Sequence, residues 1–353
     1  MFFNYLSFAF LWQIMKMARF LPSNLPCQAV FYLSSGPSET RILFTFRRFA
    51  IIMDAMNEIY ALFQQHIHTV GLREHVSFQE LTSFRTGGYA DCVLTAESAD
   101  VVADALSLCG SHGVPMHFLG NGTNILAPDE DFHGLILRLA SGEPHFDGEL
   151  ATCGAGTLLS SFCTKAAKAG LAGFEGLSGI PGTIGGAIAM NAGAYGFETA
   201  DHLSSVTLLR NSAIAEETVS PHMFSYRRSP FSAPDAIVLS AVFRFLRDDG
   251  GVQERIRALS EKRRASQPLN LPSAGSVFKR PEGAYAAALI DQCGLKGLSC
   301  GDAQVSTKHA GFIVNAGHAT SADVLSLIRA VQDAVYQKTG YVLEREIRLL
   351  SEI

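Results

Sequence analysis

The chain of 353 residues is short of charge, and no part of it carries a block of one sign. Charged residues make up only 17% of the sequence and apolar residues 48%, with a formal net charge of −5. Disordered chains combine low hydrophobicity with high net charge, so this composition predicts a folded protein with a sizeable core. Because no basic stripe interleaved with aromatic residues occurs, nucleic acid is not an expected partner.

Cysteine is scarce and scattered. The seven cysteines form no Cys-x-x-Cys pair, and their number is odd. This pattern argues against a disulfide framework and a zinc site, and it fits a reducing, cytoplasmic compartment. We therefore expect no metal, and we expect most of the thiols to be small buried apolar groups. The cysteines are Cys27, Cys92, Cys109, Cys153, Cys163, Cys293 and Cys300.

A hydrophobic run long enough to span a membrane is also missing from the start of the chain. The run at residues 2–15 is shorter than the roughly 20 apolar residues of a span, and Lys16 and Arg19 follow it, whereas a secretory signal is preceded by its charges. An interfacial anchor, a poorly formed signal and translated upstream sequence remain as interpretations, and the last is favoured. We expect residues 1–52 to be an extension without stable membrane insertion, with Met53 or Met56 as the true start.

The remaining chain mixes strand and helix patterns, which predicts an α+β fold. Helices are expected at 57–68, 99–109 (Ser98 as cap, Gly110 as stop), 158–169, 252–265, 284–293 and 322–339 (Ser321 as cap, Gly340 as stop). Strands are expected at 93–94, 114–119, 135–137, 206–209, 237–245, 311–314 and 341–350. The character of the sequence changes near Gly250, which places a boundary near Asp248. The expected divisions are therefore residues 53–248, 249–340 and a terminal strand in 341–353.

Two glycine-rich turns are candidate phosphate sites. The first follows the strand expected at 114–119, and a bare turn there leaves backbone N–H groups free for an anion. In the second turn, Pro181 fixes its own φ, while the glycines of the turn allow a ligand to approach the backbone closely. The spacing of these glycines fits neither a Rossmann nor a Walker motif. Two such turns indicate a pyrophosphate between two lobes; ordinary turns and tight backbone packing are the alternatives. The turn residues are Gly120, Asn121, Gly122, Thr123 and Asn124, then Pro181, Gly182, Thr183, Gly185 and Gly186.

Three polar residues further along are candidates for chemistry. Arg227 would provide a fixed cation for a carboxylate or enolate, and the alternative is a surface-loop arginine. Ser276, between Gly275 and Val277, would donate a proton to a substrate carbon, and the alternative is a turn serine. In the last strand, Glu346 is either a functional acid or part of a Glu–Arg ladder at a sheet edge.

Together these segments resemble one family, the UDP-N-acetylenolpyruvoylglucosamine reductases, also called UDP-N-acetylmuramate dehydrogenases. The short spacing from Tyr226 to Ser276 resembles the branch that lacks an extra substrate-covering loop. Arg280 stands where the family usually has asparagine, which puts a polar substrate contact there in doubt. The resemblance rests on seven segments in family order, at residues 83–88, 120–124, 180–186, 190–196, 226–229, 272–279 and 343–348.

The resemblance implies a two-lobed FAD-binding domain of the vanillyl-alcohol oxidase type and a C-terminal α+β substrate-binding domain. It implies that the two glycine turns, with Gly193, hold FAD without a covalent bond. NADPH would reduce the flavin, which would then reduce the enolpyruvyl group of a UDP-sugar in peptidoglycan precursor synthesis. The protein would be a cytoplasmic monomer.

The resemblance also implies residue roles. Ser276 would be the proton donor, while Arg227 and Glu346 would stabilise the enol-type intermediate. Tyr226 and Lys279 would contact the substrate.

Two other functions compete with this interpretation. An FAD-linked oxidase acting on another alcohol or sugar would keep the fold, and such relatives often bind flavin covalently through histidine. A non-catalytic nucleotide-sugar or flavin-binding module would have no activity to lose on mutation of Ser276.

Overall fold

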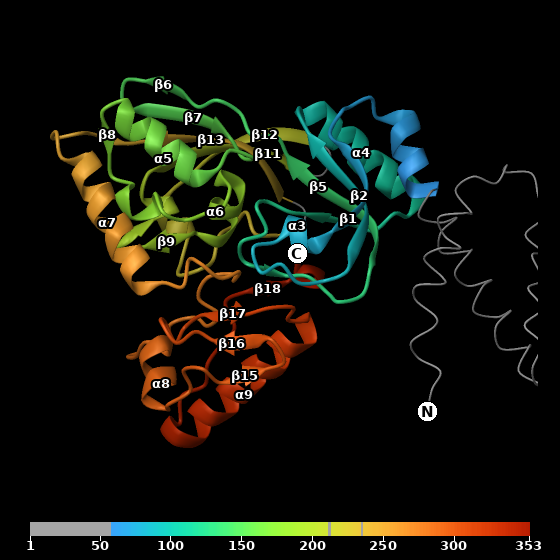
Figure 1. Ribbon diagram of the computed structural model, residues 1–353. Helices are drawn as coiled ribbons and strands as arrows, with labels where there is room; N and C mark the ends of the chain where they lie inside the picture. Colours follow the sequence, from blue (N-terminus) through green and yellow to red (C-terminus); the bar gives the residue numbers. More distant parts are fainter. Residues whose placement is uncertain (1–57, 211–212, 234–235) are drawn as a thin grey trace, which may run out of the picture. The chain divides into compact units, whose positions relative to one another are not determined.

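The structure is a computed structural model that describes residues 58–210, 213–233 and 236–353 (Figure 1). The predicted extension at residues 1–52 therefore lies outside the described residues, as do Cys27, Met53 and Met56. The first described element is a helix at residues 58–66. No helix in the described part of the chain is long and apolar enough to cross a membrane.

The first lobe is built on a four-stranded sheet in the order β1-β2-β5-β3. Strands β1 and β2 are antiparallel, and β2, β5 and β3 are parallel neighbours. Helix α4 and the short helix α3 supply buried side chains to the lobe's two core clusters. The bounds are β1 Leu72–Ser77, α3 Phe78–Leu81, β2 Tyr89–Ala96, α4 Ala99–His112, β3 Met116–Phe118 and β5 Phe132–Leu139.

Helix α4 begins as predicted and ends later. The Ser98 side chain accepts a hydrogen bond from the Val101 N–H and caps the helix. The predicted stop at Gly110 is wrong, because Gly110 remains helical and Gly113 ends the helix with a φ of 66°. Such a left-handed cap costs glycine nothing, and it satisfies the Cys109 carbonyl.

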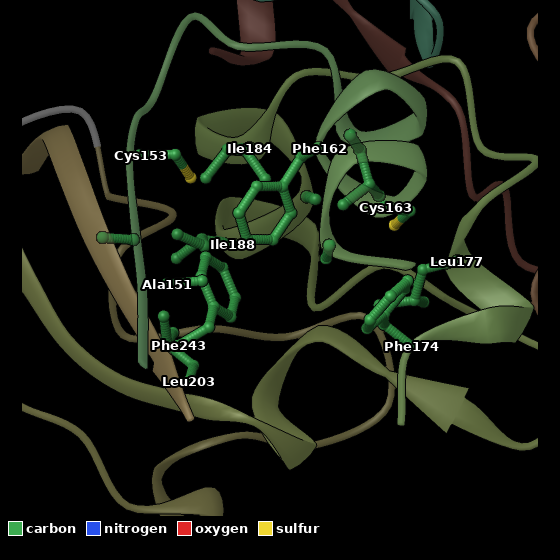
Figure 2. Packing of buried hydrophobic residues seen from close by; sticks show 14 of the residues in the cluster. Ala151, Cys153, Phe162, Cys163, Phe174, Leu177, Ile184, Ile188, Leu203 and Phe243 are labelled. Carbon is green, nitrogen blue, oxygen red and sulfur yellow. The ribbon is translucent and has the colours of Figure 1, made fainter. Parts of the chain in front are cut away.

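The second lobe is an antiparallel five-stranded sheet in the order β12-β11-β13-β7-β6. Helix α5 buries an apolar face against it, and the Phe162 ring lies 5.2 Å from that of Phe243 (Figure 2). The sheet bounds are β6 His145–Asp147, β7 Leu150–Gly154, β11 Leu203–Arg210, β12 Ala213–Thr218 and β13 Ala236–Arg244. Smaller elements are α5 Leu159–Lys168, β8 Leu171–Ala172, α6 Ile184–Met190, β9 Gly193–Ala194, β10 Phe197–Glu198 and β14 Leu246–Arg247.

The C-terminal part packs two helices around a small antiparallel sheet. Its long helix α9 stops at Gly340 as predicted, but its cap is Thr320 and not Ser321. Ser321 is already helical, and its hydroxyl donates to the Ala127 carbonyl of the first lobe instead. The bounds are α7 Val252–Ser266, α8 Ala286–Gln292, β15 Ser299–Cys300, β16 Ala303–Val305, β17 Ile313–Asn315 and α9 Ser321–Thr339.

Helix α7 packs with the second lobe. Its first residue, Val252, belongs to that lobe's core, and Arg255 forms an ion pair of 2.8 Å with the buried Glu175. The core of the C-terminal part begins at Ala274. The division near Asp248 stays a prediction, and this packing favours a division after α7.

The strand predicted at residues 341–350 is mostly wrong. Only β18 (Arg348–Leu349) is a strand, and it pairs in parallel with β4 (Ile125–Leu126) of the first lobe. Before β18, the Lys279 N–H donates to the Glu344 carbonyl and the Glu346 N–H to the Val277 carbonyl. The segment thus changes partners along its length, which prevents one continuous strand.

Five of the six described cysteines are buried, Cys300 is half-buried, and all six are free thiols. Burial raises the pKa of Cys92 and Cys153 to about 12. These thiols therefore stay protonated at neutral pH. In that form they behave as small apolar groups, as predicted.

Residues 83–88 fasten the C-terminal part to the first lobe. Phe84 is fully buried in the C-terminal core, although its neighbour Ser83 donates its N–H to the Gly122 carbonyl. The Asn315 side chain donates to the Phe84 carbonyl at 3.3 Å. The side chain of Phe84 therefore bridges two parts of the fold.

We expect Phe84→Ala to lower the free energy of unfolding by about 3–5 kcal/mol, because a buried ring is replaced by a cavity. Chemical denaturation measures this loss. Tyr336→Ala, at a ring that is 58% exposed, is the control and should change stability by about 0.5 kcal/mol or less. Equal small losses in both variants would contradict the bridging role of Phe84.

Candidate active site

A cavity of about 850 Å³ is lined by both lobes and by residues of the C-terminal part. Its volume is in the usual range for sites that hold a large organic ligand. Of the predicted residues, Tyr226 and Lys279 do not line it. Those that do are Gly120, Asn121, Gly122, Thr123, Asn124, Pro181, Gly182, Thr183, Gly185, Gly186, Gly193, Arg227, Ser276 and Glu346.

The turn at residues 120–124 follows β3 and precedes β4. None of its five backbone N–H groups donates to another residue that the structure describes. Gly122 has a φ of 60°, and a Cβ there would lie 2.1 Å from the Leu81 carbonyl oxygen. The turn therefore needs glycine for its shape, and it offers a set of free amides suited to an anion.

The second glycine stretch is only partly a loop. Helix α6 begins at Ile184, with the Thr183 side chain as cap accepting from the Gly186 N–H at 3.2 Å. The N–H groups of Ile184 and Gly185 bond to the backbone of residues 155–157, and a Cβ at Gly185 would lie 3.1 Å from the Ala155 Cβ. Tight packing therefore explains Gly185, and only the Gly182 and Thr183 amides have no described acceptor.

The two turns touch each other. The Asn121 side-chain amide donates to the Pro181 carbonyl at 2.8 Å. A Cβ at Gly120 would lie 2.6 Å from the Thr183 hydroxyl oxygen. This contact joins the two lobes at the cavity and places the free amides of both turns on one wall.

Arg227 is held tightly. Its φ is 57°, a left-handed conformation that is uncommon outside glycine, and its side chain is only 17% exposed. The guanidinium donates from Nε to Glu346 Oε1 at 2.6 Å and from Nη2 to the Gly193 carbonyl at 3.2 Å. The interpretation as a surface-loop arginine is wrong.

Glu346 joins three parts of the fold. Its N–H donates to the Val277 carbonyl, its carbonyl accepts from the Asn124 side chain at 3.2 Å, and its carboxylate binds Arg227. Its ion-pair partner thus comes from a distant segment, so an edge ladder with the neighbouring Arg348 does not explain it.

Ser276 lies one residue from this junction. Its side chain is exposed to the cavity, and its hydroxyl has no hydrogen-bond partner among the described residues. Its backbone forms a bridge with Phe312, and the preceding Gly275 has a φ of 76°. The hydroxyl is therefore available to a ligand.

Tyr226 and Lys279 lie beside the cavity. The Tyr226 hydroxyl is 3.5 Å from Glu346 Oε2, and its ring lies 4.9 Å from the Arg227 guanidinium carbon. Lys279 forms an ion pair of 3.1 Å with Glu344. Tyr226 therefore lies next to the Arg227–Glu346 pair, and neither Tyr226 nor Lys279 lines the cavity.

Three further arginines, which were not among the predicted site residues, line the cavity: Arg138, Arg263 and Arg348. With Arg227 they make four arginines against one acidic side chain, Glu346, among the described lining residues. Burial lowers the pKa of Arg138 and of Arg263, because the charged forms lose solvent. No sequence signal separated Arg263 from the other charges of its helix.

The described residues contain no cluster of three or more His, Cys, Asp or Glu side chains that is placed to hold a metal ion. Apart from Glu346 and His117, the polar groups of the cavity are amides, hydroxyls and guanidinium groups. This set favours phosphate and carboxylate ligands over a cation.

Comparisons with known proteins agree with this geometry. Residues 90–213 match the family model described as FAD binding domain, and residues 267–350 match that of the UDP-N-acetylenolpyruvoylglucosamine reductase C-terminal domain. The enzyme of that name from Clostridium novyi is 37% identical over 80% of this chain and 92% of its own. One from Clostridium botulinum is 39% identical over 77% of this chain and 90% of its own.

A solved structure is similar over the same region. The UDP-N-acetylenolpyruvylglucosamine reductase from Thermus caldophilus is 36% identical, with a TM-score of 0.69, over 79% of this chain and 99% of its own. The predicted α+β fold, with a two-lobed FAD-binding domain and a C-terminal domain, is confirmed.

Fold and site together define a flavoprotein oxidoreductase whose cavity lies between an FAD-binding domain and a further α+β part. The chain belongs to the UDP-N-acetylenolpyruvoylglucosamine reductase family. The predicted family is therefore confirmed.

We expect Gly120→Ala to weaken FAD binding about 10-fold or more, because the new methyl group would push Thr183 and its turn away. The flavin retained per chain on purification, followed by titration with FAD, measures this effect. Gly110→Ala is the control, since a Cβ there meets nothing within 4 Å. Equal flavin content in both variants would contradict a cofactor site at the contact of the two turns.

Proposed function

We propose that this protein reduces UDP-N-acetylglucosamine enolpyruvate to UDP-N-acetylmuramate, with FAD bound non-covalently and NADPH as the hydride donor. The observation that carries the proposal is the set of Arg227, Ser276 and Glu346 side chains around one wall of the cavity. The names of the similar reductases support the substrate. The reaction would serve peptidoglycan precursor synthesis in the cytoplasm.

The residues present fit FAD. The free amides of residues 120–124, with those of Gly182 and Thr183, suit a diphosphate, and the cavity volume of about 850 Å³ suits a dinucleotide. The match of residues 90–213 to an FAD binding domain supports the same cofactor. When bound, FAD supplies the hydride transfer that no side chain can perform.

Reduction of the enolpyruvyl C=C bond adds a hydride to one carbon and a proton to its neighbour, while NADPH is oxidised to NADP⁺. Negative charge develops towards the substrate carboxylate during this addition. Arg227 stabilises this charge, and Glu346 fixes the direction of the guanidinium through the 2.6 Å contact. Because the guanidinium is already fixed in direction, no free energy is needed to reorient it during the reaction.

Ser276 donates the proton. Its hydroxyl lines the cavity and has no hydrogen-bond partner among the described residues, so no existing hydrogen bond has to break before the proton is transferred. The serine oxygen then recovers its proton from solvent. Tyr226, which lies next to Glu346, and Lys279 would contact the substrate.

One chain supplies every residue that this mechanism uses, and we propose that the protein acts as a monomer.

Absorbance spectra of the purified protein test the function. Flavin bands should bleach under anaerobic NADPH and return only when UDP-N-acetylglucosamine enolpyruvate is added. Bleaching without return would discard the substrate. A colour that stays with the denatured chain would reveal covalent flavin and favour an oxidase.

We expect Ser276→Ala to leave flavin reduction by NADPH within about 2-fold of wild type and to slow reoxidation by the enolpyruvyl sugar at least 100-fold, the usual scale for a lost acid. Stopped-flow absorbance separates the two half-reactions. Ser273→Ala is the control, at a nearby serine whose hydroxyl has no hydrogen-bond partner among the described residues, and it should change neither rate much. Equal slowing of both steps in Ser276→Ala would rule out the role as proton donor.

A further inference from the structure

The first residues of α9 are bound to the first lobe, although α9 belongs to the C-terminal part. The Ser321 N–H donates to Asp129 Oδ1 at 2.7 Å, and the Ala322 N–H donates to Asp129 Oδ2 at 2.9 Å. The Ser321 hydroxyl donates to the Ala127 carbonyl and lies 3.2 Å from the Thr86 hydroxyl oxygen. We call these five residues, Thr86, Ala127, Asp129, Ser321 and Ala322, the α9 joint.

The joint fixes both the position and the direction of the helix end. Ser321 is 4% exposed and Thr86 is 1% exposed, so water would not replace a partner that either hydroxyl lost. The two oxygens of Asp129 bind two successive N–H groups of the first helical turn. Such groups have no partner within a helix, and a carboxylate is favoured beside them.

On the first-lobe side, the joint continues directly from the glycine turn at residues 120–124. That turn leads into β4, and Ala127 and Asp129 follow β4 within three residues. The free amides of the turn are among those that suit the cofactor diphosphate. The first-lobe half of the joint is therefore part of the segment that would hold FAD.

On the C-terminal side, the joint leads to Ser276. Strand β17 precedes α9 in the chain, and the residue before β17, Phe312, forms a backbone bridge with Ser276. Asn315, the last residue of β17, donates its side chain to the Phe84 carbonyl of the first lobe at 3.3 Å. One held segment therefore runs from Ser321 back to the partner of Ser276.

We propose that Asp129 and Ser321 are positioning residues that set the place of the Ser276 hydroxyl relative to FAD. This inference rests on the proposed function. The hydride and the proton are added to neighbouring carbons of one substrate, so their two sources must be held at a fixed separation. The first lobe would hold one source and the C-terminal part carries the other, and the α9 joint connects these two parts. A displacement of about 1 Å can cost roughly 100-fold in rate.

The first test uses the full chain loaded with FAD. We expect Asp129→Ala and Ser321→Ala to slow flavin reoxidation by the enolpyruvyl sugar about 10-fold or more, because the Ser276 hydroxyl is displaced. Flavin content and flavin reduction by NADPH should stay close to wild type, since neither uses that hydroxyl. Asp129→Asn keeps an acceptor oxygen for one of the two N–H groups and should recover part of the rate. A role in stability alone would not separate the two half-reactions.

A double variant tests whether the joint acts through Ser276. When Ser276 is already alanine, adding Asp129→Ala should slow reoxidation little further, because the group that the joint positions is gone. Glu130→Ala is the matched control. Glu130 is the next residue, it is exposed, and its side chain makes no hydrogen bond or ion pair with any residue that the structure describes. This control should react as wild type does in both half-reactions.

Hydrogen–deuterium exchange followed by mass spectrometry tests the joint without the substrate. In Asp129→Ala, the amides of residues 276–278 and 312–322 should exchange faster than in wild type, because the segment that the joint holds opens more often. The amides of α5, in the second lobe, should exchange as in wild type. Unchanged exchange at residues 276–278 would overturn the proposal.

Reoxidation at the wild-type rate in Asp129→Ala and Ser321→Ala would also overturn it, and so would equal slowing of both half-reactions. Losses that multiply when Asp129→Ala is combined with Ser276→Ala would show that the joint does not act through Ser276. A wild-type protein whose reduced flavin is not reoxidised by the enolpyruvyl sugar would instead contradict the proposed function. The exchange experiment would still decide whether the joint holds the segment of Ser276.

Discussion

The ion pair between Glu346 and Arg227 is the contact on which the site depends. The backbone of Glu346 is held by two hydrogen bonds: its N–H donates to the Val277 carbonyl of the C-terminal part, and its carbonyl accepts from the Asn124 side chain of the first lobe. Arg227 belongs to the second lobe and has a left-handed backbone. One residue thus connects all three parts at the cavity, and a shift of any part would change the direction of the guanidinium.

Electrostatics explain why a chain of net charge −5 can bind anionic ligands. Four arginine side chains and one acidic side chain among the described residues line the cavity, so the charge of its side chains is opposite to that of the whole chain. Of these arginines, Arg227 has an ion-pair partner in the described part of the chain. The field of the others is available to phosphate groups, and it is strengthened by partial burial away from water.

Local signals in the sequence predicted local features of the fold. Ser98 begins α4 and Gly340 ends α9 as expected, because capping depends on a few neighbouring residues. The glycine-rich turn at 120–124 could be predicted for the same reason. Helix α6 was missed because its glycines resemble a loop, and packing against residues 155–157 overrides their low helix propensity.

Features that depend on distant partners could not be read in the same way. The segment before β18 looked like one strand, yet its hydrogen bonds go first to residues 277–279 and then to the first lobe. The exposure of Arg263 to the cavity depends on how α7 packs on the second lobe, which its charged sequence does not reveal. Arg227, Ser276 and Glu346 were candidates from their residue types and positions, their roles came from the family resemblance, and the structure places all three along the cavity.

A double-mutant cycle between Arg227 and Glu346 tests the central claim that they act as one unit. The rate of flavin reoxidation by the enolpyruvyl sugar would be measured for Arg227→Gln, Glu346→Gln and the double variant. Because each single change already breaks the pair, the double variant should be little slower than the slower single variant. Losses that multiply in the double variant would contradict a shared role and would show that the two residues act independently.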